Sequence, residues 1–196
     1  IYKNQNMVGL PTISRVKNSA SQIVAQSQMI YDESGYSPAV GRGNPTTAVV
    51  WDSVSAYITT RAKFDAWGNL TEMTDGRGNT TITTFDSTYR AFPISVTSAV
   101  PSDGVYGSNQ SFTTSTQFDA TTGLALSVTD ANNQTTQMEY SDPLLRPTRV
   151  IAPNGHQTIT EYGAGTSDAT RYVKVKTQID AEKWKEAYTW FDGLGR

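Results

Sequence analysis

An aromatic residue followed directly, or nearly directly, by aspartate recurs along this chain at a nearly constant spacing. Phe64 and Phe85 are 21 residues apart, and Phe118, Tyr140 and Tyr162 follow one another at intervals of 22. A fixed period of about 20 to 50 residues is typical of repeat proteins, in which each unit buries its apolar side chains against its neighbours. The chain is therefore expected to fold as an array, and its function to belong to the array rather than to one pocket.

The repeat signature combines the aromatics, the aspartates after them, the glycines of the adjoining turns, and aspartates placed ten residues before an aromatic. Its members are Tyr31, Asp32, Phe64, Asp65, Gly68, Asp75, Phe85, Asp86, Phe118, Asp119, Gly123, Asp130, Tyr140, Tyr162, Phe191 and Asp192. Gly and Asn tolerate positive φ, and an Asp side chain accepts bonds from nearby backbone amides, so these stretches are predicted turns. Because the aspartates recur in every unit, whereas a catalytic pair occurs once, we interpret them as turn caps.

Between the turns, the side chains alternate in polarity. Thr136, Met138 and Tyr140 share one face, and Gln137 and Glu139 share the other. A period of two indicates a half-buried strand. Each repeat is therefore predicted to be a strand, turn, strand, turn unit in an all-β sheet of antiparallel hairpins, with a period of 21–22 residues. The repeat aromatics are expected to be mostly buried and to stack along one line as a ladder.

Two intervals depart from the period, because Tyr31 to Phe64 and Phe85 to Phe118 are each 33 residues. The extra residues are placed in Ser37–Thr46 and Val100–Asn109, which are rich in Pro and Gly. Both are expected to be exposed hairpin extensions at the same phase of the repeat, between an aromatic-Asp turn and the following strand. Loop closure costs grow slowly with length, so deleting either should cost no more than about 1–2 kcal/mol.

Composition excludes several classes of protein. The 196 residues contain no Cys, which excludes a disulfide scaffold and a thiolate metal site, and a net charge of −2 gives no electrostatic footprint for nucleic acid. The only histidine, His156, has neither a Cys nor a second His with which to complete a metal site or a triad. We therefore expect no enzyme activity, no cofactor and no metal, and no apolar run is long enough for a membrane span.

Two domains are predicted. Residues 1–30 lack the signature and form an N-terminal segment of uncertain structure, in which Ser19–Ile30 fits either a strand pair or a short helix. Residues 31–196 form the repeat array. Because the chain begins with Ile1 and ends inside a copy of the motif, Phe191–Arg196, we interpret it as a piece of a longer protein. Such a piece exposes open sheet edges, so edge-to-edge self-association is expected unless residues 1–30 cover an end.

These motifs resemble those of the Rhs/YD-repeat family, which includes polymorphic toxins and the shell repeats of insecticidal Tc-type toxins. The resemblance is carried by Phe64-Asp65-Ala66-Trp67-Gly68-Asn69, by Asp75-Gly76-Arg77-Gly78-Asn79 and by Phe191-Asp192-Gly193-Leu194-Gly195-Arg196, and it covers residues 31–196. It implies a curved antiparallel strip, here an arc of a hollow shell that encloses or displays a C-terminal toxin domain. The family's autoproteolytic Asp-Pro-x-Gly core is missing, since Asp142-Pro143-Leu144-Leu145 has Leu at the Gly position.

The function expected from this resemblance is structural: a wall segment of a secreted or surface-exposed bacterial toxin. Its partners would be the remaining repeats and the toxin domain. The alternative is a carbohydrate-binding or adhesive cell-surface module, in which Trp51, Trp67 and Trp184 would stack on glycans. Exposure of these three in a row favours the alternative, and burial favours the wall.

Overall fold

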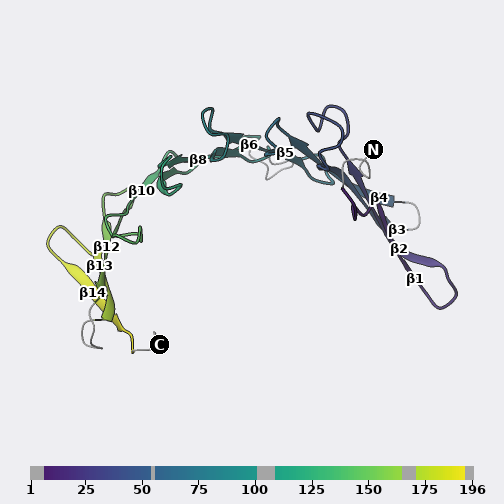
Figure 1. Cartoon of the computed structure of the whole chain (residues 1–196). Helices are drawn as coiled ribbons and strands as arrows, with labels where there is room; N and C mark the ends of the chain where they lie inside the picture. Colours follow the sequence, from purple (N-terminus) through teal and green to yellow (C-terminus); the bar gives the residue numbers. More distant parts are fainter. Residues whose placement is uncertain (1–6, 54–55, 101–108, 165–170, 193–196) are drawn as a thin grey trace. The chain divides into compact units, whose positions relative to one another are not determined.

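The computed structural model describes residues 7–53, 56–100, 109–164 and 171–192 and contains only strands and turns there. Fourteen strands lie in one open sheet in the order in which they occur along the chain, and consecutive strands run antiparallel (Figure 1). The strands are β1 Ile13–Lys17, β2 Ile23–Tyr31, β3 Pro45–Ser53, β4 Ala56–Phe64, β5 Leu70–Thr74, β6 Thr80–Phe85, β7 Pro93–Thr97, β8 Thr113–Phe118, β9 Ala125–Thr129, β10 Thr135–Glu139, β11 Arg149–Ile151, β12 Gln157–Ala164, β13 Arg171–Gln178 and β14 Trp184–Trp190. The prediction of an all-β antiparallel hairpin array is confirmed.

The chain divides into two compact units, Ile1–Thr113 and Thr114–Arg196, called here the N-terminal and C-terminal units. The N-terminal unit contains β1 to β7, and the C-terminal unit contains most of β8 and all of β9 to β14. Residues 13–31 form the hairpin β1–β2. Ser19–Ile30, predicted as a strand pair or a short helix, is neither, because it supplies the turn of this hairpin and most of the single strand β2. No helix long and apolar enough to cross a membrane occurs in the part of the chain that is described.

The signature residues mark the strand ends. Strands β2, β4, β6 and β8 each end at a repeat aromatic, and the aspartate that follows begins a turn. A five-residue turn then connects to the next strand in the simplest copy, Asp65–Asn69, where the Asp65 amide donates to the carbonyl of Asn69 over 3.0 Å. The fourth position of this turn needs a left-handed backbone, which Gly68 adopts with φ of 90°. Glycine takes this conformation without steric cost, and this explains its place in the signature.

A shift in strand register recurs at the same point of the repeat. Just before Tyr31, Phe64, Phe85 and Phe118, the register slips so that one extra residue on the following strand is left unpaired. In the second copy this residue is Thr71, whose hydroxyl donates to the carbonyl of Lys63 over 3.1 Å. One extra residue on one strand is a β-bulge, which bends the strand and increases the local twist. The period-2 pattern gave no sign of these bulges.

The sheet has no apolar core in the described residues, because a single layer covers neither of its own faces. The repeat aromatics are half-buried, which corrects the expectation that they are mostly buried, and their stacking as a ladder stays a prediction. Successive aromatics are two strands apart, about 10 Å at the usual strand spacing, whereas ring pairs interact at about 4.5–7 Å. Other aromatic side chains do form close ring pairs: Tyr89 with Phe92, and Tyr188 with Tyr172 and Trp190.

The two long intervals differ from each other, which corrects the expectation of a shared phase. The first lengthens the aromatic-Asp connection between β2 and β3, residues 32–44, and also lengthens β3 and β4. Ser37–Thr46 is not simply an exposed extension, because Gly41 is buried and Thr46 belongs to β3 and is fully buried. The second interval lengthens the other type of connection, between β7 and β8, and Val100–Asn109 lies mostly outside the described residues.

Candidate functional site

The aspartates that begin the short turns all face backbone amides. Asp65 Oδ1 accepts from the amides of Trp67 and Asn69, each over 2.9 Å, and its other oxygen accepts from the Asn69 side chain over 3.0 Å. Asp75 repeats this arrangement with Arg77 and Asn79. The same kind of capping bonds occur at Asp86, Asp119, Asp130, Asp142 and Asp180. One carboxylate per turn therefore satisfies amides that a tight reversal would otherwise leave unpaired.

These bonds also hold the carboxyl groups in the ionised form. The amide of Phe92, followed by those of Tyr89, Ala91 and Thr88, holds the pKa of Asp86 well below its usual range. Partial burial raises the pKa of Asp65, but the hydrogen bonds from Asn69 and Trp67 outweigh this effect and the net shift is downward. A general acid requires a pKa raised towards neutrality, so these shifts run against an acid–base role.

Asp32 is the most enclosed of the signature carboxylates, with only 4% of its surface exposed. Its oxygens accept from the amides of Gly41 (2.9 Å), Gly43 (2.8 Å) and Asn44 (2.9 Å) and from the hydroxyl of Ser37 (3.0 Å). Burial raises the pKa of Asp32, and these four donors lower it by more, so that the pKa lies below its ordinary value. Within the described part of the chain, the hydrogen-bond partners of this carboxylate are all donors, so it organises a loop.

Turns of successive repeats contact one another in the N-terminal unit. Arg42, in the loop around Asp32, donates to the carbonyl of Ala66 in the next signature turn over 2.8 Å. The side chain of Asn69 in that turn donates to the carbonyl of Arg90 in the following one over 2.7 Å, and the Arg90 guanidinium lies 4.6 Å from the ring centre of Trp67. These contacts join repeat to repeat outside the strand ladder, and they use side chains that the signature does not include.

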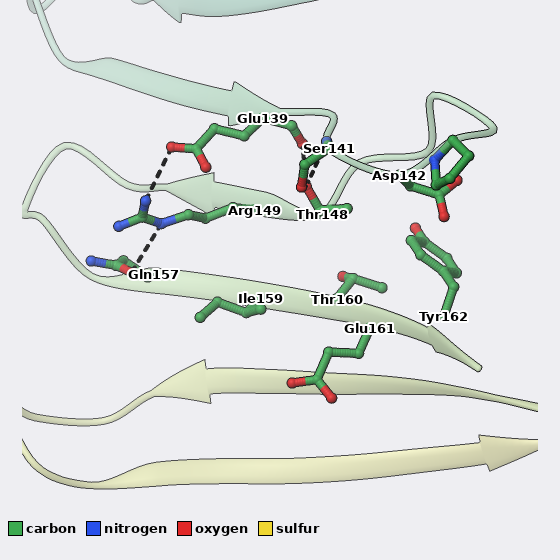
Figure 2. Close-up of a pocket in the computed structure, with 11 residues that line it drawn as sticks. Glu139, Ser141, Asp142, Thr148, Arg149, Gln157, Ile159, Thr160, Glu161 and Tyr162 are labelled. Atoms are coloured by element: carbon green, nitrogen blue, oxygen red, sulfur yellow. Dashed lines mark hydrogen bonds and ion pairs between the residues drawn. The ribbon is translucent and has the colours of Figure 1, made fainter. Parts of the chain in front are cut away.

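The C-terminal unit carries an open polar pocket of about 560 Å³ (Figure 2). Its lining comes from β10, β11, β12 and the connections between them: Glu139, Ser141, Asp142, Pro143, Thr148, Arg149, Gln157, Ile159, Thr160, Glu161 and Tyr162. Figure 2 shows the Arg149 guanidinium between Glu139 and Gln157, each 3.1 Å away, and the hydroxyls of Ser141 and Thr148 bonded to each other over 2.9 Å. The polar groups of the pocket are thus largely satisfied by one another.

The carboxylates of this pocket are each held by a cation. Glu139 pairs with Arg149 over 3.1 Å and Glu161 with Lys176 over 2.6 Å. Two bonds from the Arg146 guanidinium lower the pKa of Asp142 to about 2, and the Lys176 ammonium lowers the pKa of Glu161. Paired glycosidase carboxyls need one member kept protonated. The carboxylates that line this pocket are ionised and paired with cations, which does not match the protonated acid that this reaction needs.

The residues predicted for glycan stacking differ in exposure. Trp67 is 62% exposed, whereas Trp51 and Trp184 are half-buried. The indole nitrogen of Trp51 is buried and has no hydrogen-bond partner among the described residues. His156 is exposed in the turn before β12. The described residues contain no group of three or more His, Asp or Glu side chains that could hold a metal ion.

Sequence reasoning missed an aromatic cluster on β13 and β14. Tyr188 lies between Tyr172 and Trp190, with ring centres 5.8 Å and 5.1 Å away, and its ring is nearly parallel to that of Trp190. The period-2 alternation of Tyr172 and Lys174 on one strand, and of Tyr188 and Trp190 on the next, could have placed them on one face. Their pairing depends on the register of the two strands, which the sequence pattern left open.

No protein-family model and no curated protein matches the chain. Solved structures do match. The chain is similar to a Tc holotoxin pore structure of Photorhabdus luminescens that carries a TccC3 substitution, with 15% identity and a TM-score of 0.55, over 94% of this chain and 10% of that one. It is also similar to a crystal structure of TcdB2-TccC3-TEV, with 14% identity and a TM-score of 0.49, over 93% of this chain and 11% of that one. The chain therefore spans about a tenth of the length of these chains, and the likeness to the holotoxin pore structure shows the fold.

Proposed function

We propose that this chain is a non-enzymatic structural segment of a bacterial Rhs/YD-repeat toxin. It forms part of a β-shell that encapsulates or displays a C-terminal toxin domain, in a protein that is secreted or held at the cell surface. Its partners are the remaining repeats and the toxin domain. The observation that carries the proposal is the strand order. Fourteen consecutive antiparallel strands, with no crossover, match the fold of a Tc holotoxin chain over 94% of the present chain.

The absence of an apolar core from the described residues supports a role as a wall. A sheet with one layer buries little apolar surface, so its stability rests on strand pairing, on turn caps and on contacts between turns. Such a sheet can be lengthened by adding further repeats at its ends, and its stability does not depend on enclosing a core. The charge-paired side chains in the pocket of the C-terminal unit fit the same role, since ion pairs between neighbouring strands fix their register.

The recurring bulges support a curved strip. Four of the bulges directly precede a repeat aromatic, so these repeats depart from regular pairing at the same place. Bulges at regular positions are a general means of curving a sheet. A flat strip could not enclose a volume, whereas repeated bends of one sign can. In this proposal, the bulge is the element of the repeat that turns an open sheet into an arc.

Small-angle X-ray scattering tests the strip. Fourteen strands at about 4.8 Å each span about 65 Å, whereas a compact domain of this length has a radius of gyration of about 16 Å. We expect the monomeric chain to have a radius of gyration of about 20 Å, and a value near 16 Å contradicts the proposal. Cryo-electron microscopy of the whole product of the gene then tests encapsulation. A closed wall around internal density is expected, and an open strip with nothing enclosed argues against it.

The alternative with Trp51, Trp67 and Trp184 as a row of glycan contacts has weaker support. Two of these three side chains are half-buried, and the exposed Trp67 is covered on one side by the guanidinium of Arg90. Trp51 and Trp184 therefore fit a role in packing within the strip, and Trp67 fits a role in joining neighbouring turns.

A further inference from the structure

An exposed aromatic cluster occupies one face of β13 and β14. The strand register sets Tyr172 opposite Trp190, Lys174 opposite Tyr188, and Lys176 opposite Glu186. Residues opposite one another in antiparallel strands point to the same side of the sheet, and so do residues two apart. The rings and the charges of these strands therefore form one surface. Its aromatic residues belong neither to the repeat signature nor to the lining of the pocket in Figure 2.

The cluster is held rigid but leaves ring surface open to solvent. Trp190 is 57% exposed and Tyr188 is 41% exposed. The two rings are 5.1 Å apart and inclined by only 12°, and the ammonium of Lys174 lies 5.1 Å from the centre of the Tyr188 ring. Tyr188 is thus contacted by Trp190 and Lys174, and Trp190 stacks on Tyr188 while more than half of its surface stays exposed. Rings fixed in advance lose little conformational freedom when a ligand binds.

The charges on this face indicate what kind of ligand fits. Lys174 pairs with Glu186 over 3.0 Å, and Lys176 with Glu161 over 2.6 Å. Two cations and two carboxylates cancel, so the face attracts neither an anionic nor a cationic partner. An apolar peptide would strip water from these pairs at a considerable cost. A neutral polyol replaces that water with hydroxyl groups, which both donate to carboxylates and accept from ammonium groups.

We propose that Tyr172, Tyr188 and Trp190 form a binding site for a neutral oligosaccharide, with the ion pair of Lys174 and Glu186 at its side. The C–H face of a sugar ring carries partial positive charge and stacks on the electron-rich open face of Trp190. Hydroxyls at the edge of the same ring reach Glu186 and Lys174. This site is separate from the wall function and does not require it.

The test is titration calorimetry of the whole 196-residue chain with cellohexaose, maltohexaose and chitohexaose, with a heparin hexasaccharide as the charged probe. Saturable binding of at least one neutral probe is expected, together with weaker binding or none of heparin. Trp190→Ala should weaken the binding at least tenfold, and Trp190→Phe, which keeps an aromatic ring, should weaken it less. Trp67→Ala is the matched control, because Trp67 is as exposed as Trp190 but lies in the N-terminal unit; its binding should equal that of the wild type.

Three results would overturn the proposal. They are a lack of saturable binding for every neutral probe, a Trp190→Ala variant that binds as tightly as the wild type, and a Trp67→Ala variant that loses binding. Circular dichroism and thermal melting of each variant separate loss of contact from loss of fold. If Trp190→Ala unfolds β14, Glu186→Gln provides the second measurement, since it keeps the shape of the side chain and removes its charge. It should weaken binding severalfold, and unchanged binding would contradict the proposal. Scattering data on the same samples report on the strip independently, so either proposal can fail without the other.

Discussion

Asp32 and Asp65 occupy the same position of the repeat, directly after the aromatic that ends a strand, yet they build different structures. Asp65 caps a five-residue turn by accepting from amides two and four residues ahead, and it remains half-buried. Asp32 lies at the start of a connection of 13 residues and accepts from amides nine to twelve residues ahead, with 4% of its surface exposed. One sequence signal thus serves a local cap in one repeat and the centre of a folded loop in another.

The difference shows how a repeat accepts an insertion. In the short turn, the carboxylate replaces bonds that water could otherwise supply. In the long loop, it gathers the buried amide of Gly41 and the part-buried amides of Gly43 and Asn44, so its removal leaves enclosed donors unpaired, and unpaired buried donors are costly. The loop then returns to the array through Arg42, which donates to Ala66 in the next turn. Length alone does not make the insertion dispensable.

Deletion of Ser37–Thr46, closed with Asn-Gly, should have the largest effect on this comparison. It removes all four donors to Asp32 and the buried Thr46 at the start of β3. We expect a loss of more than about 4 kcal/mol, which is a large part of the stability of a typical domain. Hydrogen exchange measured by mass spectrometry should show lost protection across β2 and β3. Deletion of Val100–Asn109 is the control, expected to cost no more than about 1–2 kcal/mol. Equal effects would mean that the Asp32 loop is an ordinary surface extension.

Single substitutions at the two aspartates sharpen the contrast. Asp32→Ala should lower the free energy of unfolding by about 3 kcal/mol, because the buried amide of Gly41 and three part-buried donors lose their acceptor. Asp65→Ala should cost about 1 kcal/mol, as the loss of a solvent-accessible cap does. Urea unfolding followed by circular dichroism measures both. If the two variants are equally stable, the burial of Asp32 has no energetic consequence and the distinction drawn between the loops fails.

The parts of the fold that follow from local chemistry were open to prediction. The pattern at Asp65 to Asn69 indicates a turn because Asp accepts amides and Gly68 takes a positive φ, both of which depend only on neighbouring residues. The bulges before the aromatics were not predictable, because the unpaired residue, such as Thr71, is decided by pairing between strands. The aromatic cluster of Tyr172 and Trp190 likewise depends on register. The exposure of Trp51 and Trp67 also differs, because Trp51 lies in strand β3 between neighbouring strands and Trp67 lies in a turn.

Acid should weaken both regions, and through the same groups. The pKa of Asp32 and the pKa of Asp65 are lower in the folded chain than the ordinary value of 3.8. A depressed carboxyl pKa contributes stability that is present above the unfolded value and is lost as the pH falls through the folded one. The wild type should therefore lose stability below about pH 4, and little should change between pH 5 and 7. Asp32→Asn and Asp65→Asn should each flatten the acid slope in urea unfolding curves. A slope unchanged in both variants would mean that these carboxyls are not the groups responsible.

The smallest expected difference concerns the glycines of the two regions. Gly68 and Gly43 both have positive φ, of 90° and 77°. A methyl group on Gly68 meets nothing within 4 Å, whereas one on Gly43 lies 3.1 Å from the sulfur of Met7, at the flexible end of a side chain. The backbone strain of about 1–2 kcal/mol is therefore common to Gly68→Ala and Gly43→Ala, and the contact at Gly43 should add less than about 0.5 kcal/mol. Alanine also keeps the amide of residue 43 that Asp32 requires. Urea unfolding of the two variants in parallel measures the difference. A Gly43→Ala loss as large as that of Asp32→Ala would show that the long loop depends on its backbone path as much as on its carboxylate.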